Sequence, residues 1–310
     1  MKILQSALGD HLVLLLGLGM IGKSIESALL DARYRTALNL PVDWNDNALG
    51  DARAQAQAYC RSESPRRISV CWAAGGKGFG CQENEAALET AILLAVLEMV
   101  GGLREAGARE TIDFHFMSSA GGLFEGQRVV TPASTPSPRR PYGHMKLAQE
   151  RAVRERLPEV AVSVYRPSTV YGPRRQLARH GLINNLVNDG LRGCPTVLDA
   201  RVMSLRDYVY TADVGAFVAK RIRFPEPAPV ARTHFLVSSR CTSIFEVVHI
   251  IERVLHLKLR CRYDAAFGNH SDITFSHSVL PAGWAPTPLE VGVRQFAAGR
   301  HAHLPVPLGA

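Results

Sequence analysis

The sequence has no hydrophobic run long enough to cross a membrane. A membrane-spanning helix needs about 20 consecutive apolar residues, whereas the longest apolar runs cover residues 12–18 and 91–100, and the second contains Glu98. Lys2 followed by the apolar residues 12–16 faintly resembles a signal peptide, but a glycine motif follows in place of a small-residue cleavage site. We therefore expect no contact with a membrane, and we interpret residues 12–16 as a buried strand.

Cysteine is scarce and scattered. The chain has no CxxC pair and no Cys/His cluster at the spacing of zinc ligands. Disulfide frameworks are typical of short secreted chains, so isolated cysteines in a chain of 310 residues indicate a reducing compartment. The pattern predicts a cytoplasmic protein with mostly buried, reduced thiols and no metal. The cysteines are Cys60, Cys71, Cys81, Cys194, Cys241 and Cys261.

Long runs of like charge are missing too. The net charge is +8 and the isoelectric point is near 9.4, but the basic residues occur in pairs such as Arg139 with Arg140 and Arg174 with Arg175. A nucleic-acid-binding tail carries about five or six like charges in succession. The distribution therefore predicts a solvated basic surface and no nucleic-acid partner.

The sequence does contain an alternation of short apolar runs with helical periodicity, which is typical of βα units in a parallel sheet. The predicted strands cover residues 12–16, 34–40, 68–74, 111–118 and 160–165. The predicted helices between them cover residues 23–32, 48–60, 83–103 and 142–156. The fold class is therefore predicted to be α/β, a Rossmann-type doubly wound parallel sheet, with residues 12–16 as its first strand.

The pattern weakens after Gly172. Helices are predicted over residues 183–191, 214–221 and 244–255, with a short strand over 235–238 and a turn-rich stretch over 281–288. We predict a dinucleotide-binding domain over residues 1–172 and a smaller, mainly substrate-binding lobe over residues 173–310. Some segments of this lobe are expected to return to the sheet.

A glycine motif follows the first predicted strand and opens the first predicted helix, which is the context that a GxGxxG match requires. The first glycine permits a tight turn, the second lets the backbone approach a diphosphate, and the third allows close helix packing. The exposed amides at the helix N-terminus attract the anion. The predicted cofactor-binding residues of this turn are Gly17, Gly19, Met20, Ile21 and Gly22.

The choice between NAD and NADP depends on the second predicted strand. Asp43 follows the last glycine of the motif by about 20 residues, the spacing expected of an acid that binds the ribose 2′-hydroxyl of NAD. This slightly favours NAD. The alternatives are that Asp43 is a loop or cap residue and that Arg33 or Arg35 neutralises the 2′-phosphate of NADP.

Three residues further along the chain suggest hydride-transfer chemistry. Ser119 follows the strand predicted to end at Ser118, and after a proline-rich loop a helix begins with Tyr142 and Lys146 on one face. A free phenol titrates near pH 10, and a neighbouring ammonium with an oxidised nicotinamide favours the phenolate that acts as a base. The ordered set of Ser119, Tyr142 and Lys146 predicts a catalytic site and not a surface tyrosine beside a solvated lysine.

With these motifs the chain resembles the extended short-chain dehydrogenase/reductase superfamily. Within it, the chain resembles the NAD-dependent epimerase/dehydratase family, which acts mainly on nucleotide sugars. The resemblance runs nearly end to end. It is carried by the glycine turn, by the strand over residues 70–75 that ends in Ala73, Ala74 and Gly75, and by the segments at residues 141–146, 166–173, 206–214 and 283–292.

The resemblance implies roles for individual residues. Tyr142 would be the catalytic acid and base, Lys146 its partner and a ligand of the nicotinamide ribose, Ser119 a contact of the substrate hydroxyl, and Arg206 a diphosphate clamp. It also implies a homodimer formed by the helices over residues 83–103 and 142–156. The implied cofactor contacts beyond the glycine turn are Ala73, Ala74, Gly75, Ser118 and Pro167, and Thr169 is a further implied substrate contact.

The departures from the family pattern bear on the substrate. Leu16 replaces the first glycine of the usual motif, Thr169 replaces an asparagine, and Phe267 takes the place of a second phosphate-binding arginine. The acidic motif that usually follows a third strand is absent. These differences leave open whether the substrate carries a diphosphate.

The reaction type is narrowed by the residues after Ser119. Family dehydratases have Asp-Glu there, whereas this chain has Ala120 and Gly121. We therefore rank a nucleotide-sugar epimerase first and an NADPH-dependent reductase of a keto substrate second. A cofactor-sensing regulator without turnover is the third hypothesis, and the presence of Tyr142 and Lys146 argues against it.

Overall fold

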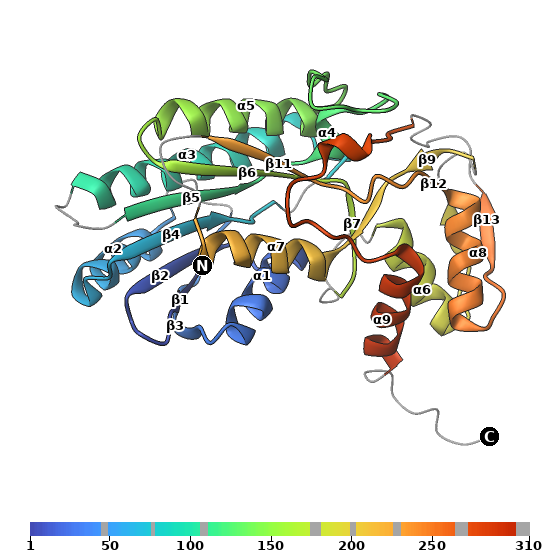
Figure 1. The fold of residues 1–310 in the computed structure, drawn as a ribbon, viewed down its shortest axis with the longest axis horizontal. Coiled ribbons are helices and arrows are strands. Elements are labelled where there is room, and N and C mark those ends of the chain that lie inside the picture. Colours follow the sequence, from blue (N-terminus) through green and yellow to red (C-terminus); the bar gives the residue numbers. More distant parts are fainter. Residues whose placement is uncertain are drawn as a thin grey trace.

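The protein is described by a computed structural model covering residues 1–44, 49–75, 78–105, 111–173, 181–198, 203–225, 231–263 and 272–301. A central sheet of seven strands has the order β11-β6-β5-β4-β2-β1-β3 (Figure 1). These strands are β1 (Lys2–Gln5), β2 (His11–Leu16), β3 (Arg35–Asn39), β4 (Arg67–Trp72), β5 (Thr111–Met117), β6 (Ala161–Pro167) and β11 (Arg232–Leu236).

In this sheet the neighbouring strands β2, β4, β5, β6 and β11 pair in parallel, as predicted, but β1 pairs antiparallel with both β2 and β3. The prediction that residues 12–16 form the first strand was therefore wrong. A four-residue strand with polar ends has too short a pattern to recognise, and its position depends on pairing with β2. As a consequence, β3 lies two strands away from β2.

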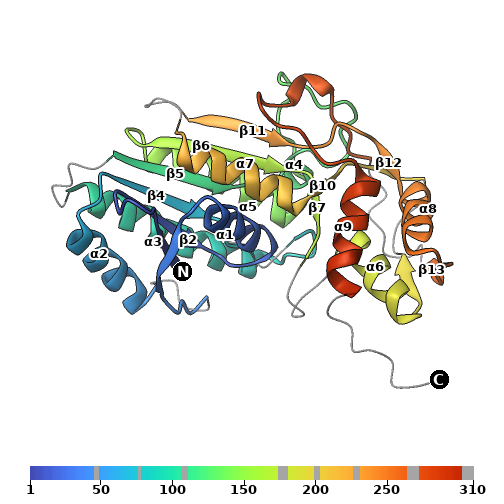
Figure 2. The same ribbon diagram turned by 60° about the horizontal axis from the view of Figure 1, so that its bottom comes forward.

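Helices cover both faces of the sheet and make three layers (Figures 1 and 2). One face is covered by α2 (Asp51–Glu63), α3 (Glu83–Glu105) and α5 (Pro141–Arg156). The other face is covered by α1 (Met20–Asp31) and α7 (Thr211–Arg223). This arrangement confirms the predicted α/β class.

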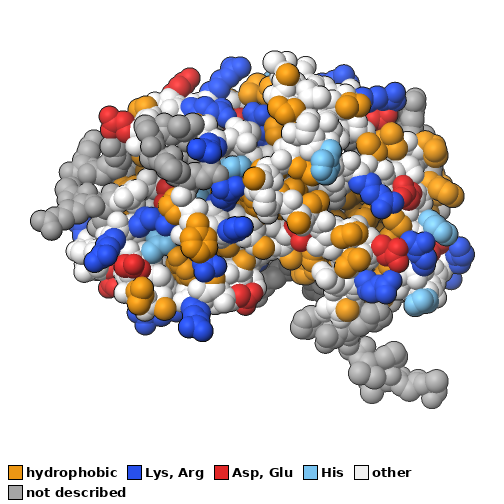
Figure 3. Space-filling view, viewed as in Figure 1, with side chains coloured by type: hydrophobic (Ala, Val, Ile, Leu, Met, Phe, Trp, Pro, Cys, Tyr) orange, Lys and Arg blue, Asp and Glu red, His pale blue; other side chains and the backbone are white. Residues whose placement is uncertain are grey.

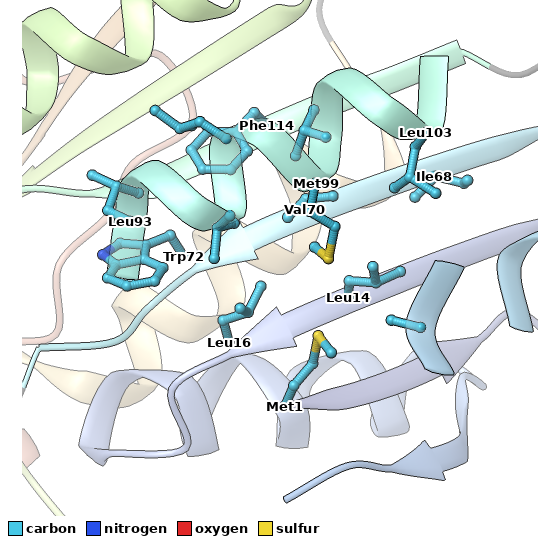
Figure 4. Close-up of a cluster of buried hydrophobic side chains, with 14 of the residues drawn as sticks. Met1, Leu14, Leu16, Ile68, Val70, Trp72, Leu93, Met99, Leu103 and Phe114 are labelled. Carbon is cyan, nitrogen blue, oxygen red and sulfur yellow. The ribbon is translucent and has the colours of Figure 1, made fainter. Parts of the chain in front are cut away.

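The strand β2 explains why the central strands have continuous apolar sequences. Leu14 and Leu16 join the core under α2 and α3, whereas Val13 and Leu15 join the core under α1 and α7. Both faces are covered, so every residue of β2 is buried. Burying one such side chain fully stabilises the fold by about 1.5–3 kcal/mol. Figure 4 shows the first core at Leu14, Leu16, Val70, Trp72, Leu93 and Met99.

The helix α3 contains a long apolar stretch. An 18-residue window within Glu83–Leu103 has a mean hydropathy of 1.8, so the helix is by length and composition long enough to cross a membrane, but half of that window is buried inside the molecule. Leu93, Val96 and Val100 pack on the sheet. The helix therefore has the position of a core helix.

A second group of elements lies beyond the carboxyl ends of the sheet strands (Figure 1). Three helices, α6 (Leu182–Arg192), α8 (Ile244–Leu255) and α9 (Leu289–His301), share a separate core. The strand β11, from the C-terminal half, lies at the edge of the central sheet. The small strands here are β7 (Thr169–Tyr171), β8 (Thr196–Leu198), β9 (Leu205–Arg206), β10 (Tyr208–Tyr210), β12 (Thr242–Ser243) and β13 (Cys261–Tyr263).

On the face seen in Figure 3, Lys and Arg side chains are interspersed with acidic and apolar ones.

The six cysteines all lie in the described part of the chain, and none of them is in a disulfide. Cys194 and Cys241 are exposed and Cys261 is partly buried. The expectation of mostly buried thiols therefore holds for only half of them.

Candidate active site

The glycine turn after β2 is closely packed at two of its three glycines. Gly17 has a φ of +90°, and a Cβ atom there would lie 2.3 Å from the backbone nitrogen of Ala74. A Cβ atom at Gly22 would lie 1.8 Å from the carbonyl oxygen of Gly17. Gly19 differs, because nothing lies within 4 Å of its Cβ position. The turn is therefore tight on the protein side and open at Gly19.

The helix α1 begins directly at this turn. Gly19 is its N-cap, no side chain caps it, and its first turn has no acidic residue. The backbone amides of a helix N-terminus attract an anion. Together with the open space at Gly19, this geometry fits the diphosphate of a dinucleotide.

The turn that follows β4 lies against the glycine turn. The backbone N–H of Ala73 donates to the carbonyl oxygen of Leu16 at 2.8 Å, and Ala74 contacts the Cβ position of Gly17. Gly75 has a φ of +151°, which favours glycine. A Cβ atom at Gly75 would lie 3.7 Å from Nζ of Lys146. The structure therefore joins the predicted dinucleotide turn to the predicted catalytic helix.

Tyr142 stands in the first turn of α5, just after Pro141 at the helix start. Its ring packs against Gly122 in the short helix α4 (Ala120–Leu123), where a Cβ atom would lie 3.0 Å from the ring. The ring centroids of Tyr142 and Phe79 are 6.2 Å apart. Nζ of Lys146 lies 5.9 Å from the Tyr142 ring centroid. The predicted pair thus shares one helix face and lies close together.

Lys146 is almost fully buried and makes an ion pair that the sequence analysis did not predict. Its Nζ donates to Oε1 of Glu89 on α3 at 2.8 Å and to Oε1 of Gln149 at 3.1 Å. The side chains of Lys146 and Glu89 are only 3% and 10% exposed. In the sequence, the feature that could have indicated this pair is Glu89 itself, an acid within an alanine- and leucine-rich helix. The pairing itself needs the contact between α3 and α5.

The two serines after β5 have different surroundings. Ser119 is the N-cap of α4, and its Oγ accepts from the N–H of Gly122 at 3.0 Å. Ser118 donates from Oγ to Oε1 of the buried Glu150 at 2.6 Å. Ser118 therefore ties the end of β5 to α5, and a cofactor contact of this residue stays a prediction.

Glu150 is the centre of a buried charged group that the sequence analysis missed. The guanidinium of Arg166 donates to both of its carboxylate oxygens, at 2.9 and 2.7 Å. Burial alone would raise the pKa of Glu150, but the hydrogen bonds and charge of Arg166, with help from Ser118 and Arg154, hold that pKa below its usual value. This pair fixes α5 against β6.

The predicted substrate contacts lie where the sheet meets the second lobe. Arg206 is in β9, and burial lowers its pKa from the usual value. Thr169 pairs with Tyr208 between β7 and β10. Next to Arg206, Asp207 accepts from Ser168 and Ser238 at 2.5 and 2.8 Å. Burial raises the pKa of Asp207. Phe267 lies outside the described residues.

The residues that were considered as contacts of the adenosine ribose or its 2′-phosphate lie outside the glycine turn. Asp43 is exposed and follows the end of β3, with β1 between β3 and β2. Arg35 donates to Oε1 of Gln5 at 2.8 Å. Gln5 pairs with Leu12, at the opposite end of β2 from Gly17. The structure does not bring Arg35 to the glycine turn, and the role of Asp43 stays a prediction.

Lys2 was not considered in the sequence analysis, yet it lies near the carboxyl end of β2. It pairs with Leu15, and its ammonium contacts the carboxylate of Glu26 on α1. Lys23 donates to the same carboxylate at 2.7 Å. Lys2, from a strand that was not predicted, therefore lies near the carboxyl end of β2, where the sequence analysis expected the acid Asp43.

The model of the NAD dependent epimerase/dehydratase family matches residues 13–234, well over half of the chain. The chain belongs to this family. The matched segment holds the glycine turn, Tyr142, Lys146 and Arg206. The resemblance seen in the sequence is thus confirmed at the level of the epimerase/dehydratase family.

Solved structures agree with this assignment. UDP-glucose 4-epimerase of Thermotoga maritima, solved with UDP-glucose, has a TM-score of 0.74 at 19% identity and covers 94% of this chain and 98% of its own. The Thermus thermophilus enzyme of the same name, complexed with NAD, has a TM-score of 0.73 at 19% identity and covers 94% of this chain and 99% of its own. RMD of Pseudomonas aeruginosa, complexed with NADPH, has a TM-score of 0.73 at 19% identity and covers 95% of this chain and 100% of its own. These likenesses confirm the Rossmann-like fold. No curated protein sequence matches significantly.

Proposed function

We propose that the protein is an NAD(P)-dependent epimerase of a nucleotide sugar that works through a keto intermediate. The observation that carries this proposal is the position of Tyr142 and Lys146. They lie one helical turn apart, with Nζ of Lys146 5.9 Å from the Tyr142 ring and 3.7 Å from the Cβ position of Gly75. Gly75 follows the turn that packs on Gly17, so acid–base groups and dinucleotide turn form one site.

The side chains divide the acid–base work. As phenolate, Tyr142 takes the proton of a substrate hydroxyl when that carbon is oxidised, and as phenol it returns the proton when the keto group is reduced. The Lys146 ammonium stabilises negative charge on the tyrosine oxygen during this transfer. Ser119 accepts the N–H of Gly122 and keeps its own proton for the substrate oxygen. The three groups thus cover proton removal, charge stabilisation and orientation.

The cofactor in this proposal is NAD(P), which supplies the hydride acceptor and donor when bound. Gly17, Gly19, Met20, Ile21 and Gly22 would hold its diphosphate. The other proposed cofactor contacts are Asp43, Ala73, Ala74, Gly75, Ser118, Tyr142, Lys146 and Pro167. We favour NAD because the spacing of Asp43 suits a ribose hydroxyl.

The proposed substrate is a sugar linked to a nucleotide, and the T. maritima structure with UDP-glucose supports this class. Arg206 would clamp a diphosphate, since a guanidinium matches phosphate geometry, and Thr169 would be a second substrate contact. In this proposal residues 1–172 bind the cofactor and residues 173–310 mainly bind the substrate.

An NADPH-dependent reductase of a nucleotide-linked or other keto substrate is the second candidate. The observation in its favour is the structure of RMD with NADPH, which is as similar as the Thermus epimerase. The same Tyr142 and Lys146 would serve it, but the hydride would leave with the product instead of returning to the sugar. Net consumption of NADPH distinguishes the two.

We also propose a cytoplasmic homodimer. The outer faces of α3 and α5 form a groove of about 780 Å³. Its apolar lining includes Ala87, Ala91, Leu94, Met145 and Ala148, and its polar lining is Glu83, Thr90, Arg139 and His144. The apolar part of this face suits the same face of a second copy. The catalytic helix would then be stabilised from both sides.

The test combines cofactor identification with turnover. We would identify any nicotinamide nucleotide that co-purifies, then follow UDP-glucose, UDP-glucuronic acid and GDP-sugars by NMR with NAD or NADPH. Tyr142→Phe should lower turnover by about 10²–10⁴-fold, the usual contribution of a general acid–base group. Its cofactor affinity should stay within about threefold of wild type, a difference below 1 kcal/mol.

Tyr263→Phe is the matched control, because Tyr263 is exposed on β13 in the second lobe. It should turn over substrate at the wild-type rate. Undiminished turnover by Tyr142→Phe would contradict the assigned role. If no nucleotide sugar reacts and neither cofactor binds, the enzymatic proposal fails.

A further inference from the structure

Glu89 is a largely buried acid that the proposed reaction does not use. It lies in the second turn of α3, and its carboxylate accepts from Lys146 at 2.8 Å. Gln149 supports the pair by accepting from Lys146 at 3.1 Å. Replacing a buried ion pair by apolar groups is often neutral or stabilising. Stability alone therefore gives little reason for a charge pair at this place.

The surroundings hold the Lys146 ammonium in one position. It lies 5.5 Å from the Phe116 ring centroid and 5.9 Å from the Tyr142 ring centroid, both within cation–π range. On its remaining side it meets Glu89 and Gln149. An ammonium enclosed by two rings, a carboxylate and an amide has lost most of its freedom, so its distance from Tyr142 is fixed.

The same carboxylate reaches the cofactor side of the site. A Cβ atom at Gly75 would lie 3.6 and 3.7 Å from the two carboxylate oxygens of Glu89 and 3.7 Å from Nζ of Lys146. The absence of a side chain at Gly75 therefore leaves the ion pair next to the turn that packs on Gly17. A charge here acts on whatever occupies the space between this turn and Tyr142.

Other charged groups near Tyr142 already have partners. Arg140 stacks on Phe79 and donates to Glu125 at 2.9 Å. Glu150 is held by Arg166 on the other side of α5. Among the described residues in contact with the Tyr142 ring and Gly75, the charge pair is thus Lys146 and Glu89.

We propose that Glu89 is a positioning residue whose carboxylate fixes Lys146 beside Tyr142 and offsets its charge, which makes this site favour the oxidised, cationic nicotinamide. This inference rests on the proposed function. A bare ammonium would repel the cationic ring, whereas the Glu89 carboxylate cancels this repulsion. Glu89 therefore strengthens binding of the oxidised form relative to the reduced form.

The experiment is a charge cycle read by equilibrium binding. Binding of NAD⁺ and NADH, or of NADP⁺ and NADPH if those bind better, is measured by calorimetry on the purified full chain. Glu89→Gln removes one negative charge and should weaken the oxidised form relative to the reduced form by at least about threefold. Lys146→Met should shift the ratio the opposite way. The double variant, again neutral, should return close to the wild-type ratio.

Two further variants separate electrostatics from packing. Glu98→Gln, on the same helix with a side chain 56% exposed, should leave the ratio unchanged. Glu89→Asp keeps the charge and should retain the wild-type ratio even if overall affinity falls. A structural role alone would weaken both redox forms equally. Should Glu89→Gln fail to fold, the comparison of Glu89→Asp, Lys146→Met and the neutral double variant still gives the sign.

The outcomes for this inference and for the proposed function are distinct. If the wild type binds both redox forms and epimerises a sugar while Glu89→Gln keeps the wild-type ratio, the role of Glu89 is overturned and the enzyme assignment stands. If Glu89→Gln and Lys146→Met shift the ratio in the same direction, the charge argument is also wrong. A wild type that binds neither redox form overturns both proposals.

Discussion

The three glycines of the turn after β2 are required for different physical reasons. At Gly17 the φ of +90° and the 2.3 Å approach to Ala74 both exclude a side chain. At Gly22 the carbonyl oxygen of Gly17 stands in the Cβ position. Gly19 has open space at that position and an ordinary φ of -71°. Packing explains the first and third glycines, and for the second we propose contact with the cofactor as the reason.

Two alanine variants test this division. Gly17→Ala should lower the free energy of unfolding by about 3 kcal/mol or more, because it combines left-handed strain with a backbone clash. Gly19→Ala should cost less than about 1 kcal/mol of stability but weaken cofactor binding by at least about tenfold, or 1.4 kcal/mol. Chemical denaturation and calorimetry provide the two readouts. A Gly19→Ala protein with wild-type affinity would contradict the assigned path of the diphosphate.

At the scale of elements, a buried polar ladder crosses the sheet at the end opposite the active site. His11 in β2 contacts the Tyr34 hydroxyl at 2.6 Å and the Ser69 hydroxyl at 2.8 Å. Farther along, Asp113 of β5 accepts from Arg67 at 2.9 Å and contacts His115 at 2.6 Å. These side chains replace apolar residues under α7, and their bonds tie the three neighbouring strands β2, β4 and β5 to one register.

This ladder predicts how stability depends on pH. Burial and the charge of Arg67 lower the pKa of His11 to about 4, whereas an unfolded histidine titrates near 6.5. Between these values only the unfolded chain binds the proton, so stability is complete above about pH 6.5 and falls as the pH drops. The loss from pH 6.5 to 4.5 should be about 2–3 kcal/mol.

Urea unfolding across this pH range measures the effect. His11→Gln should be less stable at neutral pH but show a flatter curve between pH 6.5 and 4.5. His249→Gln, which removes an exposed histidine of α8, is the control and should keep the wild-type slope. A wild-type slope in His11→Gln would contradict the assignment.

The elements also show what the sequence could predict. Local periodicity located α1, α3, α5, α8 and the strands β2 to β6 within a few residues, and the spacing of Tyr142 and Lys146 needed only one helix. What it missed depends on contacts between distant segments. The strand β1 is too short to show a sequence pattern of its own. The ion pairs of Glu89 with Lys146 and of Glu150 with Arg166 form only when α3 and β6 pack on α5.

At the scale of the whole molecule, α5 connects the inside of the candidate site to an outer surface. Lys146 and Glu89 face each other between α5 and α3, while Ala148 and Ala91 of the same helices line the outer groove. Small side chains let a second copy approach closely. A dimer formed here would restrain the relative position of the two helices that hold the ion pair.

The oligomer prediction follows from that surface. In sedimentation experiments the wild type should have twice the chain mass of 33.9 kDa, and Ala91→Arg should shift it toward the monomer because a long charged side chain enters an apolar contact. Ala54→Arg makes the same substitution on an exposed position of α2 and should leave the mass unchanged. The monomeric variant should also bind cofactor more weakly, since α3 and α5 lose their support. A wild type that stays monomeric at micromolar concentration would show that this groove has another purpose.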